Sequence, residues 1–191
     1  MTRSYASALS PEYALLGFLA QKTSHGYELH QRLSVELGQV WHVSLSQVYN
    51  ILNRLEGQGF IEGVIEEQDK LPARQMYHLT ASGLQRLETW LNTPTGSSVR
   101  AIRVEFVTRL YFASMLGEHK SSQLLQAQLK EIRAGLKRLE GEMANTPPDQ
   151  VYNRLGMDLR LRQLKAVLGW IKQTEIVLDK DKSNHETSFS G

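Results

Sequence analysis

One stretch, residues 44–80, constrains the fold more than any other part of this 191-residue chain. It opens with Ser44, whose hydroxyl can cap a helix, and Gln47 three residues later completes a capping box. Gly57 and Gly59 predict the end of this helix, because glycine readily takes the left-handed conformation found at many helix ends. The apolar residues between these signals recur at helical spacing on one face: Leu45, Val48, Ile51, Leu52 and Leu55.

A pair of strands is predicted directly after this helix. Residues 60–67 and 74–79 form the two strands, and the segment QDKLPA joins them. A short helix with a polar outer face, followed by a two-stranded hairpin, is the arrangement by which a winged helix-turn-helix presents a reading helix and a wing to DNA. The stretch therefore predicts this DNA-binding fold and identifies its two contact elements.

The residues around this stretch complete the predicted domain. Ser10 predicts the cap of a first helix, because serine is a favoured residue at that position. Further helices are predicted over residues 26–37 and 81–91. The polar segment 92–100 contains Pro, Gly and Ser and predicts a domain boundary. We therefore predict a winged helix-turn-helix domain over residues 8–92.

The remainder of the chain predicts long helices and shows no strand signal. Residues 103–116 are apolar on almost all sides, so this helix needs cover on more than one face. Two heptad stripes follow, joined by a Pro-containing turn, and predict an antiparallel coiled-coil hairpin. We predict a helical dimerisation domain over residues 101–179, because the first helix adds more apolar surface than one hairpin can cover. Residues 180–191 are polar and are predicted to form a flexible tail.

The predicted fold class is mainly α with a small β-hairpin. It combines an N-terminal winged helix-turn-helix with a C-terminal, antiparallel, coiled-coil-like helical domain that joins two copies into a homodimer. The residues predicted to mediate dimerisation are Val107, Leu110, Tyr111, Leu125, Leu129, Ile132, Leu136, Leu139, Leu161, Leu164, Leu168 and Ile171.

Several classes of function are disfavoured by the residues that the sequence lacks. The chain has no cysteine, and its six histidines show no metal-ligand spacing. No Ser/His/Asp set, phosphate-binding glycine loop or paired carboxylates stand out, so we predict a protein that is not an enzyme and needs no cofactor or metal. No apolar run approaches the ~20 residues of a membrane span. We therefore predict a cytoplasmic protein without a membrane partner.

The distribution of charge limits how the chain can bind DNA. Residues 1–92 carry seven Lys and Arg against nine Asp and Glu, and the remainder carries fifteen against eleven. The predicted DNA-binding half is therefore slightly acidic. Its affinity for DNA should depend on a few well-placed cations and on neutral hydrogen-bond donors rather than on a broad positive field.

Three segments resemble the PadR family of transcriptional regulators: HGYELHQRL, VSLSQVYNILNRLEGQGFIEG and PARQMYHLTASG. The resemblance extends to the branch with a virulence-activator-type C-terminal domain and covers roughly residues 8–180. It implies a winged-helix dimer that binds near-palindromic operators and dimerises through its C-terminal helices. One departure occurs at Gln75 and Met76, where members commonly carry basic residues and only Arg74 remains basic here.

The candidate DNA contacts lie on the polar face of the central helix and on the wing. Gln47 and Asn50 can pair bidentately with adenine, and Arg54 can contact guanine or a phosphate. An ordinary solvated helix presents a similar face, but the capping box, the glycine stop and the hairpin together favour DNA contact. Tyr49 is equally consistent with a half-buried packing residue and with a phosphate donor. The full set is Ser44, Ser46, Gln47, Tyr49, Asn50, Asn53, Arg54, Lys70 and Arg74, with the last two on the wing.

Two further hypotheses about function remain open from the sequence. The acidic balance of residues 1–92 is compatible with a protein-interaction adaptor that uses a winged helix without binding DNA. A small-molecule sensor whose ligand alters the dimer is compatible with the DNA-binding function. Trp90, Phe106, Tyr111 and Trp170 could line an apolar effector pocket, although core packing accounts for them equally well.

Overall fold

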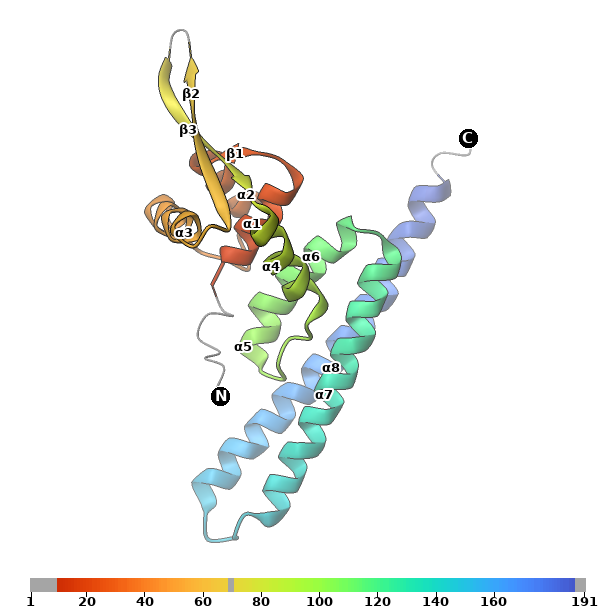
Figure 1. The fold of residues 1–191 in the computed structure, drawn as a ribbon. Helices are drawn as coiled ribbons and strands as arrows, with labels where there is room; N and C mark the ends of the chain where they lie inside the picture. The colour runs from red at the N-terminus through yellow and green to blue at the C-terminus, as the bar shows by residue number, and fades with distance from the viewer. Residues whose placement is uncertain (1–9, 69–70, 188–191) are drawn as a thin grey trace. The chain divides into compact units, whose positions relative to one another are not determined.

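The computed structural model describes residues 10–68 and 71–187, which divide into two compact units (Figure 1). The first unit comprises the described residues up to Thr93 together with Val107–Phe112. The second unit comprises Pro94–Phe106 and the described residues from Ala113 onward. No described helix is both long enough and apolar enough to cross a membrane.

The first unit is a winged helix-turn-helix, as predicted. Its elements in chain order are α1 (Glu12–Gln21), β1 (Ser24–His25), α2 (Gly26–Glu36), α3 (Leu45–Gly57), β2 (Ile61–Gln68), β3 (Leu71–Leu79) and α4 (Ala81–Asn92). The three strands form an antiparallel sheet in the order β1-β3-β2. The sequence did not predict β1, which has only two residues and pairs with Tyr77 and Met76 of β3.

Local signals account for the limits of α3. Ser44 is the N-cap, and both hydrogen bonds of the predicted capping box are present. Gly59 has a φ of 73°, the left-handed conformation that glycine adopts without the steric cost of a Cβ. Ser10, in contrast, does not cap α1: that helix begins after Pro11 without a side-chain cap, and the Ser10 hydroxyl lies 3.5 Å from Nη2 of Arg54.

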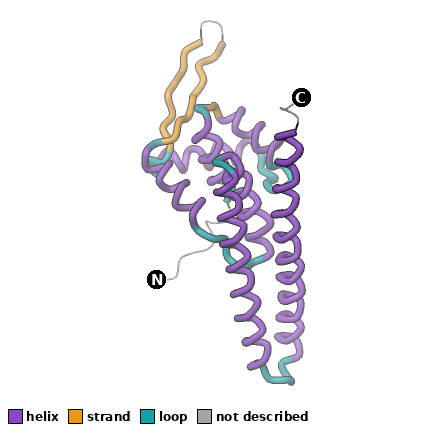
Figure 2. The backbone as a smooth tube through the Cα atoms, turned by 90° about the vertical axis from the view of Figure 1, so that its right-hand side faces the viewer, coloured by secondary structure: helices purple, strands orange, loops and turns teal. Residues whose placement is uncertain are grey.

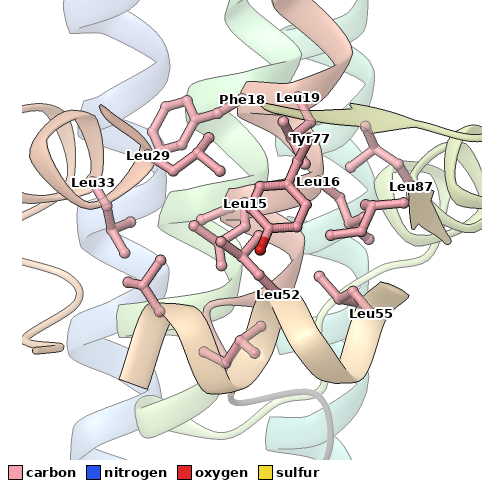
Figure 3. Packing of buried hydrophobic residues seen from close by; sticks show 14 of the residues in the cluster. Leu15, Leu16, Phe18, Leu19, Leu29, Leu33, Leu52, Leu55, Tyr77 and Leu87 are labelled. Atoms are coloured by element: carbon pink, nitrogen blue, oxygen red, sulfur yellow. The ribbon is translucent and has the colours of Figure 1, made fainter. Parts of the chain in front are cut away.

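The core of the first unit lies between α1 and the elements around it (Figure 3). Leu15, Leu16 and Phe18 of α1 are fully buried and meet leucines from α2, α3 and α4. Tyr77 of β3 is 1% exposed, and this burial raises the pKa of its phenol, with the Glu56 carboxylate adding to the effect. The buried side chains therefore hold α3 and the sheet against one common helix.

The wing is longer than the sequence predicted. β2 and β3 pair from Ile61–Leu79 to Gln68–Leu71, so the second strand begins at Leu71 rather than at residue 74. The connecting residues 69 and 70 lie outside the described residues. Figures 1 and 2 show the hairpin extending beyond the helices of its own unit.

The second unit is built around two long antiparallel helices, α7 (Glu118–Asn145) and α8 (Val151–Thr187), which lie side by side (Figure 2). A third helical segment precedes them. It consists of α5 (Val99–Ala101), a π-helical turn (Ile102–Phe106) and α6 (Val107–Met115). The predicted helix over residues 103–116 therefore begins earlier and contains a π-helical turn.

The division into units differs from the predicted domain limits at Val107–Phe112, which cluster with the first unit. Aromatic packing accounts for this difference. The rings of Tyr111 and Phe112 meet the ring of Phe18 edge-on, at centroid distances of 6.2 and 5.4 Å. The three predicted dimerisation residues of this helix, Val107, Leu110 and Tyr111, therefore belong to the first unit.

Candidate nucleic-acid interface

The outer face of α3 presents a row of polar side chains. Val48, Leu52 and Leu55 are buried on the inner face of the helix. The opposite face exposes Ser46, Gln47, Asn50 and Asn53, and Ser44 is exposed at the N-cap. Ser46, Asn50 and Asn53 follow at intervals of four and three residues, so they form one stripe along the helix.

Gln47 and Asn50 differ in how much of the side-chain amide is already hydrogen-bonded within the protein. Gln47 Oε1 accepts a hydrogen bond from the Ser44 backbone N–H at 2.8 Å, and Ser44 Oγ accepts one from the Gln47 N–H at 3.3 Å. Bidentate pairing with adenine uses both the oxygen and the nitrogen of an amide. The oxygen of the Gln47 amide is therefore held by the capping box, and its NH₂ group is the part that remains without a partner among the described residues. Asn50 makes no side-chain hydrogen bond to any described residue, so both ends of its amide are free.

Tyr49 lies on the flank of α3, between the inner and outer faces. Its side chain is 39% exposed, and its ring lies against the start of α2 at Gly26, where an added Cβ would come within 2.5 Å of Cε1. The ring therefore packs against α2, while part of the side chain stays accessible to solvent.

Arg54 takes part in a cluster that sequence reasoning did not identify. Its Nη2 donates to Oε2 of Glu12 at 2.8 Å, and Nη2 of Arg86 donates to Oε1 at 2.5 Å. The Glu12 side chain is 4% exposed, whereas that of Arg54 is 48% exposed. One carboxylate thus joins α1, α3 and α4. The available signal in the sequence was Glu12 itself, the single charged residue of the mostly apolar α1.

The wing is tied to the end of α3 through Glu56. Its Oε1 accepts hydrogen bonds from the Gly63 backbone N–H at 2.9 Å and from Nε2 of Gln75 at 3.3 Å. Gln75 is one of the two neutral residues noted in the sequence as a departure, and its amide links the second strand of the hairpin to α3. The backbone of Arg74 pairs opposite Glu66, and Lys70 lies outside the described residues.

The connection between α2 and α3 is also fixed by hydrogen bonds. His30 Nε2 lies 3.1 Å from the Val43 carbonyl oxygen, and the Trp41 indole N–H donates to Thr108 Oγ1 at 2.7 Å. The two helices of the helix-turn-helix are therefore held in one relative orientation, which is a requirement for a helix that reads bases.

Sequence comparisons decide the family. The chain is 32% identical over 181 residues to the negative transcriptional regulator PadR of Bacillus subtilis (strain 168), a match that covers 89% of this chain and 98% of that protein. The chain belongs to the PadR-like family of transcriptional regulators. Residues 15–89 match that family, and residues 102–179 match the family described as virulence activator alpha C-term. PadR-like proteins are regulators rather than enzymes.

Two solved structures of the same relative are also similar to this chain. The crystal structure of Bacillus subtilis PadR with operator DNA is 30% identical, covers 87% of this chain and 97% of that chain, and gives a TM-score of 0.42. The structure of that protein with p-coumaric acid is also 30% identical, covers 88% and 98% respectively, and gives a TM-score of 0.37.

In this PadR-like chain, the heptad residues of the second unit face one another within a single molecule. Leu168 is half-buried, and the other predicted dimerisation residues of α7 and α8 are buried: Leu125, Leu129, Ile132, Leu136, Leu139, Leu161, Leu164 and Ile171. A second apolar row on α8 is exposed instead. Tyr152, Leu155 and Leu159 are 89%, 59% and 57% exposed, and Trp170 is 41% exposed. The spacing of three and four residues was the signal for this row, which sequence analysis missed.

The four aromatic residues considered as an effector pocket do not share one unit. Trp90 stacks on Tyr13 in the first unit, with ring centroids 4.6 Å apart, and Tyr111 also belongs to that unit. Phe106 and Trp170 meet edge-on in the second unit at 6.3 Å. Each of the four rings therefore packs against another ring of its own unit.

Proposed function

We propose that this PadR-like regulator binds near-palindromic operator DNA as a homodimer and reads bases with α3. The exposed polar stripe of α3, held in place by the capping box and by the Glu56 links to the wing, is the observation that carries the proposal. The relationship to Bacillus subtilis PadR, solved with operator DNA, supports it. The proposed place of action is the cytoplasm.

The following roles are proposed for the individual residues. Asn50, with both ends of its amide free, is the proposed adenine reader, and Ser46, Gln47 and Asn53 add contacts along the same stripe. Ser44, Tyr49 and Arg54 are proposed to bind phosphates. The ion pair of Arg54 with Glu12 leaves its other N–H groups available and fixes the guanidinium. Lys70 and Arg74 are proposed to contact the backbone or minor groove from the wing.

A dimer is proposed because one winged helix covers only a half-site. Its few phosphate contacts would give weak and largely nonspecific binding. Linking two copies makes the second contact intramolecular and raises affinity without new chemistry. We propose that the exposed apolar row of α8 forms the contact between copies. The buried heptad residues support it by holding the α7–α8 hairpin together.

A small-molecule effector is proposed as a second partner. Bacillus subtilis PadR has been solved with p-coumaric acid, and the chain covers 98% of that relative's length at 32% identity. Proteins related over their full length commonly share the type of partner, so we expect a small molecule to alter DNA binding by this chain.

Selection of bound fragments from random duplexes tests the proposed function. We expect an enriched near-palindromic motif, two chains bound per duplex, and an affinity that falls steeply with salt as counterions are released. The adaptor alternative, with which the acidic balance of residues 1–92 is compatible, predicts no enrichment and no salt-sensitive binding to any duplex. That result would reject the proposed function.

A further inference from the structure

A cavity of about 490 Å³, open to solvent, lies in the second unit between residues 97–103 and the first half of α8. This volume falls within the ~300–1,000 Å³ typical of small-molecule sites. Arg100 of α5 and Arg103 of the π-helical turn line one side, and Arg160 of α8 lines the other. These three arginines are exposed. Ser97, Ser98 and Gln163 add further polar side chains.

The three arginines of the cavity have no protein partner within the described chain. None forms a side-chain hydrogen bond or ion pair with a described residue, and no described Asp or Glu lines the cavity. Two other arginines of α7 and α8 are paired: Arg138 lies 3.0 Å from Glu131, and Arg162 lies 2.7 Å from Asp158. The cavity therefore gathers three uncompensated positive charges, which attract a negatively charged occupant.

Helical spacing places the polar residues of each wall on the side that lines the cavity. Arg100 and Arg103 are three residues apart, so they lie on the same side of their helical segment. Arg160 and Gln163 have the same spacing on α8. Arg103 lies in a π-helical turn, a feature that occurs frequently at functional sites.

The loop that carries Ser97 and Ser98 is held in position by contacts within the protein. The Thr95 backbone N–H donates to Oε1 of Gln128 at 3.0 Å, and Nε2 of Gln128 donates to the Thr95 carbonyl at 2.8 Å. Both residues are fully buried. The loop also sits close against Gly135 of α7, where an added Cβ would come within 2.4 Å of Ser97 Oγ. The polar wall is therefore preformed, which lowers the entropic cost of binding.

We propose that this cavity binds a small oxyanion with at least two negative charges, either a phosphomonoester or a di- or tricarboxylate. The planar guanidinium group matches the oxygen pairs of phosphate and carboxylate groups equally well. A singly charged aromatic acid such as p-coumaric acid would leave most of the positive charge uncompensated. The site itself stands on the cavity, and only its role as an effector site rests on the proposed function.

Calorimetric titration of the full-length protein without DNA tests the site. The probes are glycerol 3-phosphate for the phosphate arm and citrate for the carboxylate arm, at constant ionic strength, with benzoate as the singly charged comparison. We expect one of the first two to bind saturably and benzoate to bind at least about tenfold more weakly. Arg100→Gln/Arg160→Gln should weaken that binding by about tenfold or more. Absence of binding by both multiply charged probes, or equal binding of benzoate, would overturn the proposal.

A matched variant separates the site from general electrostatic attraction. Arg133→Gln/Arg162→Gln removes the same charge from exposed positions of α7 and α8 and should leave probe binding unchanged. Equal loss in both variants would contradict a specific site. DNA binding of Arg100→Gln/Arg160→Gln without a probe should match that of the wild type, and a large loss would instead place these arginines in the DNA interface. Because the titration contains no DNA, failure of the proposed function leaves its result unaffected.

Discussion

Arg54 Nη2 donates to Oε2 of Glu12 at 2.8 Å, which joins the proposed DNA-reading helix to a nearly buried carboxylate of α1. Arg86 holds the other oxygen of the same carboxylate from α4, and its guanidinium lies 4.4 Å from the ring centroid of Phe60. The position of α3 therefore depends on one ion cluster as well as on the apolar core.

The first prediction concerns this cluster. Glu12→Gln should lower the free energy of unfolding by about 1–3 kcal/mol. It removes the negative charge of the carboxylate and leaves Arg54 and Arg86 without an anionic partner there. Glu28→Gln removes the more exposed Lys22–Glu28 ion pair and should cost less than about 1 kcal/mol. Urea denaturation followed by circular dichroism measures both variants. Equal stability of the two would show that the Glu12 cluster contributes little.

The second prediction separates the two roles of Gln47. Gln47→Glu keeps a side-chain oxygen for the capping box but removes the NH₂ donor and adds a negative charge. Its stability should match the wild type while its DNA affinity falls. Gln47→Ala should lower both stability and DNA affinity. The loss of stability should be about 0.5–1 kcal/mol, because the side-chain half of the capping box is removed. Thermal unfolding and fluorescence anisotropy with a duplex measure the two effects. Unchanged DNA affinity of Gln47→Glu would remove Gln47 from the interface.

The third prediction concerns the wing. Lys70→Ala and Arg74→Ala should each weaken binding to all duplexes to a similar degree, because phosphate contacts carry no base information. Each should also reduce the slope of log affinity against log salt by about one. Binding measured at several salt concentrations tests this, with Gln31→Ala on α2 as an uncharged control. Loss confined to one base sequence would contradict the assignment to phosphates.

The fourth prediction separates the proposed dimer contact from the core of the hairpin. Leu155→Glu/Leu159→Glu changes exposed residues of α8 and should leave helicity unchanged while weakening dimerisation by about tenfold or more. Leu136→Asp instead buries a charge between α7 and α8 and should unfold the hairpin. Sedimentation and circular dichroism distinguish these outcomes. A stable dimer of the exposed-row variant would exclude this surface of α8.

The elements that the sequence predicted are those with strong local signals. The capping box at Ser44 and the glycine at residue 59 limit α3 through contacts within a few residues, and both are present. The elements that were missed depend on distant residues. The strand β1 exists only through pairing with Tyr77 and Met76, and its two residues carry no pattern of their own.

The candidate site was predicted less completely, for the same reason. The exposed stripe of α3 follows from helical spacing alone. The partners of Arg54 and Gln75 do not, because Glu12 and Glu56 lie 42 and 19 residues away in the chain. The heptad stripes likewise predicted paired helices, but spacing alone does not state whether the partner helix belongs to the same chain.

The central claim is that α3 reads bases, and the specificity ratio of Asn50→Ala tests it most directly. This ratio is the affinity for the selected duplex divided by the affinity for a scrambled duplex at one salt concentration. For Asn50→Ala we expect the ratio to fall by an amount equivalent to about 1–3 kcal/mol, because a bidentate adenine contact is lost. The circular dichroism spectrum should stay unchanged. Gln85→Ala, an exposed amide of α4, should keep the wild-type ratio. An unchanged ratio for a folded Asn50→Ala protein would contradict base reading by Asn50 of α3.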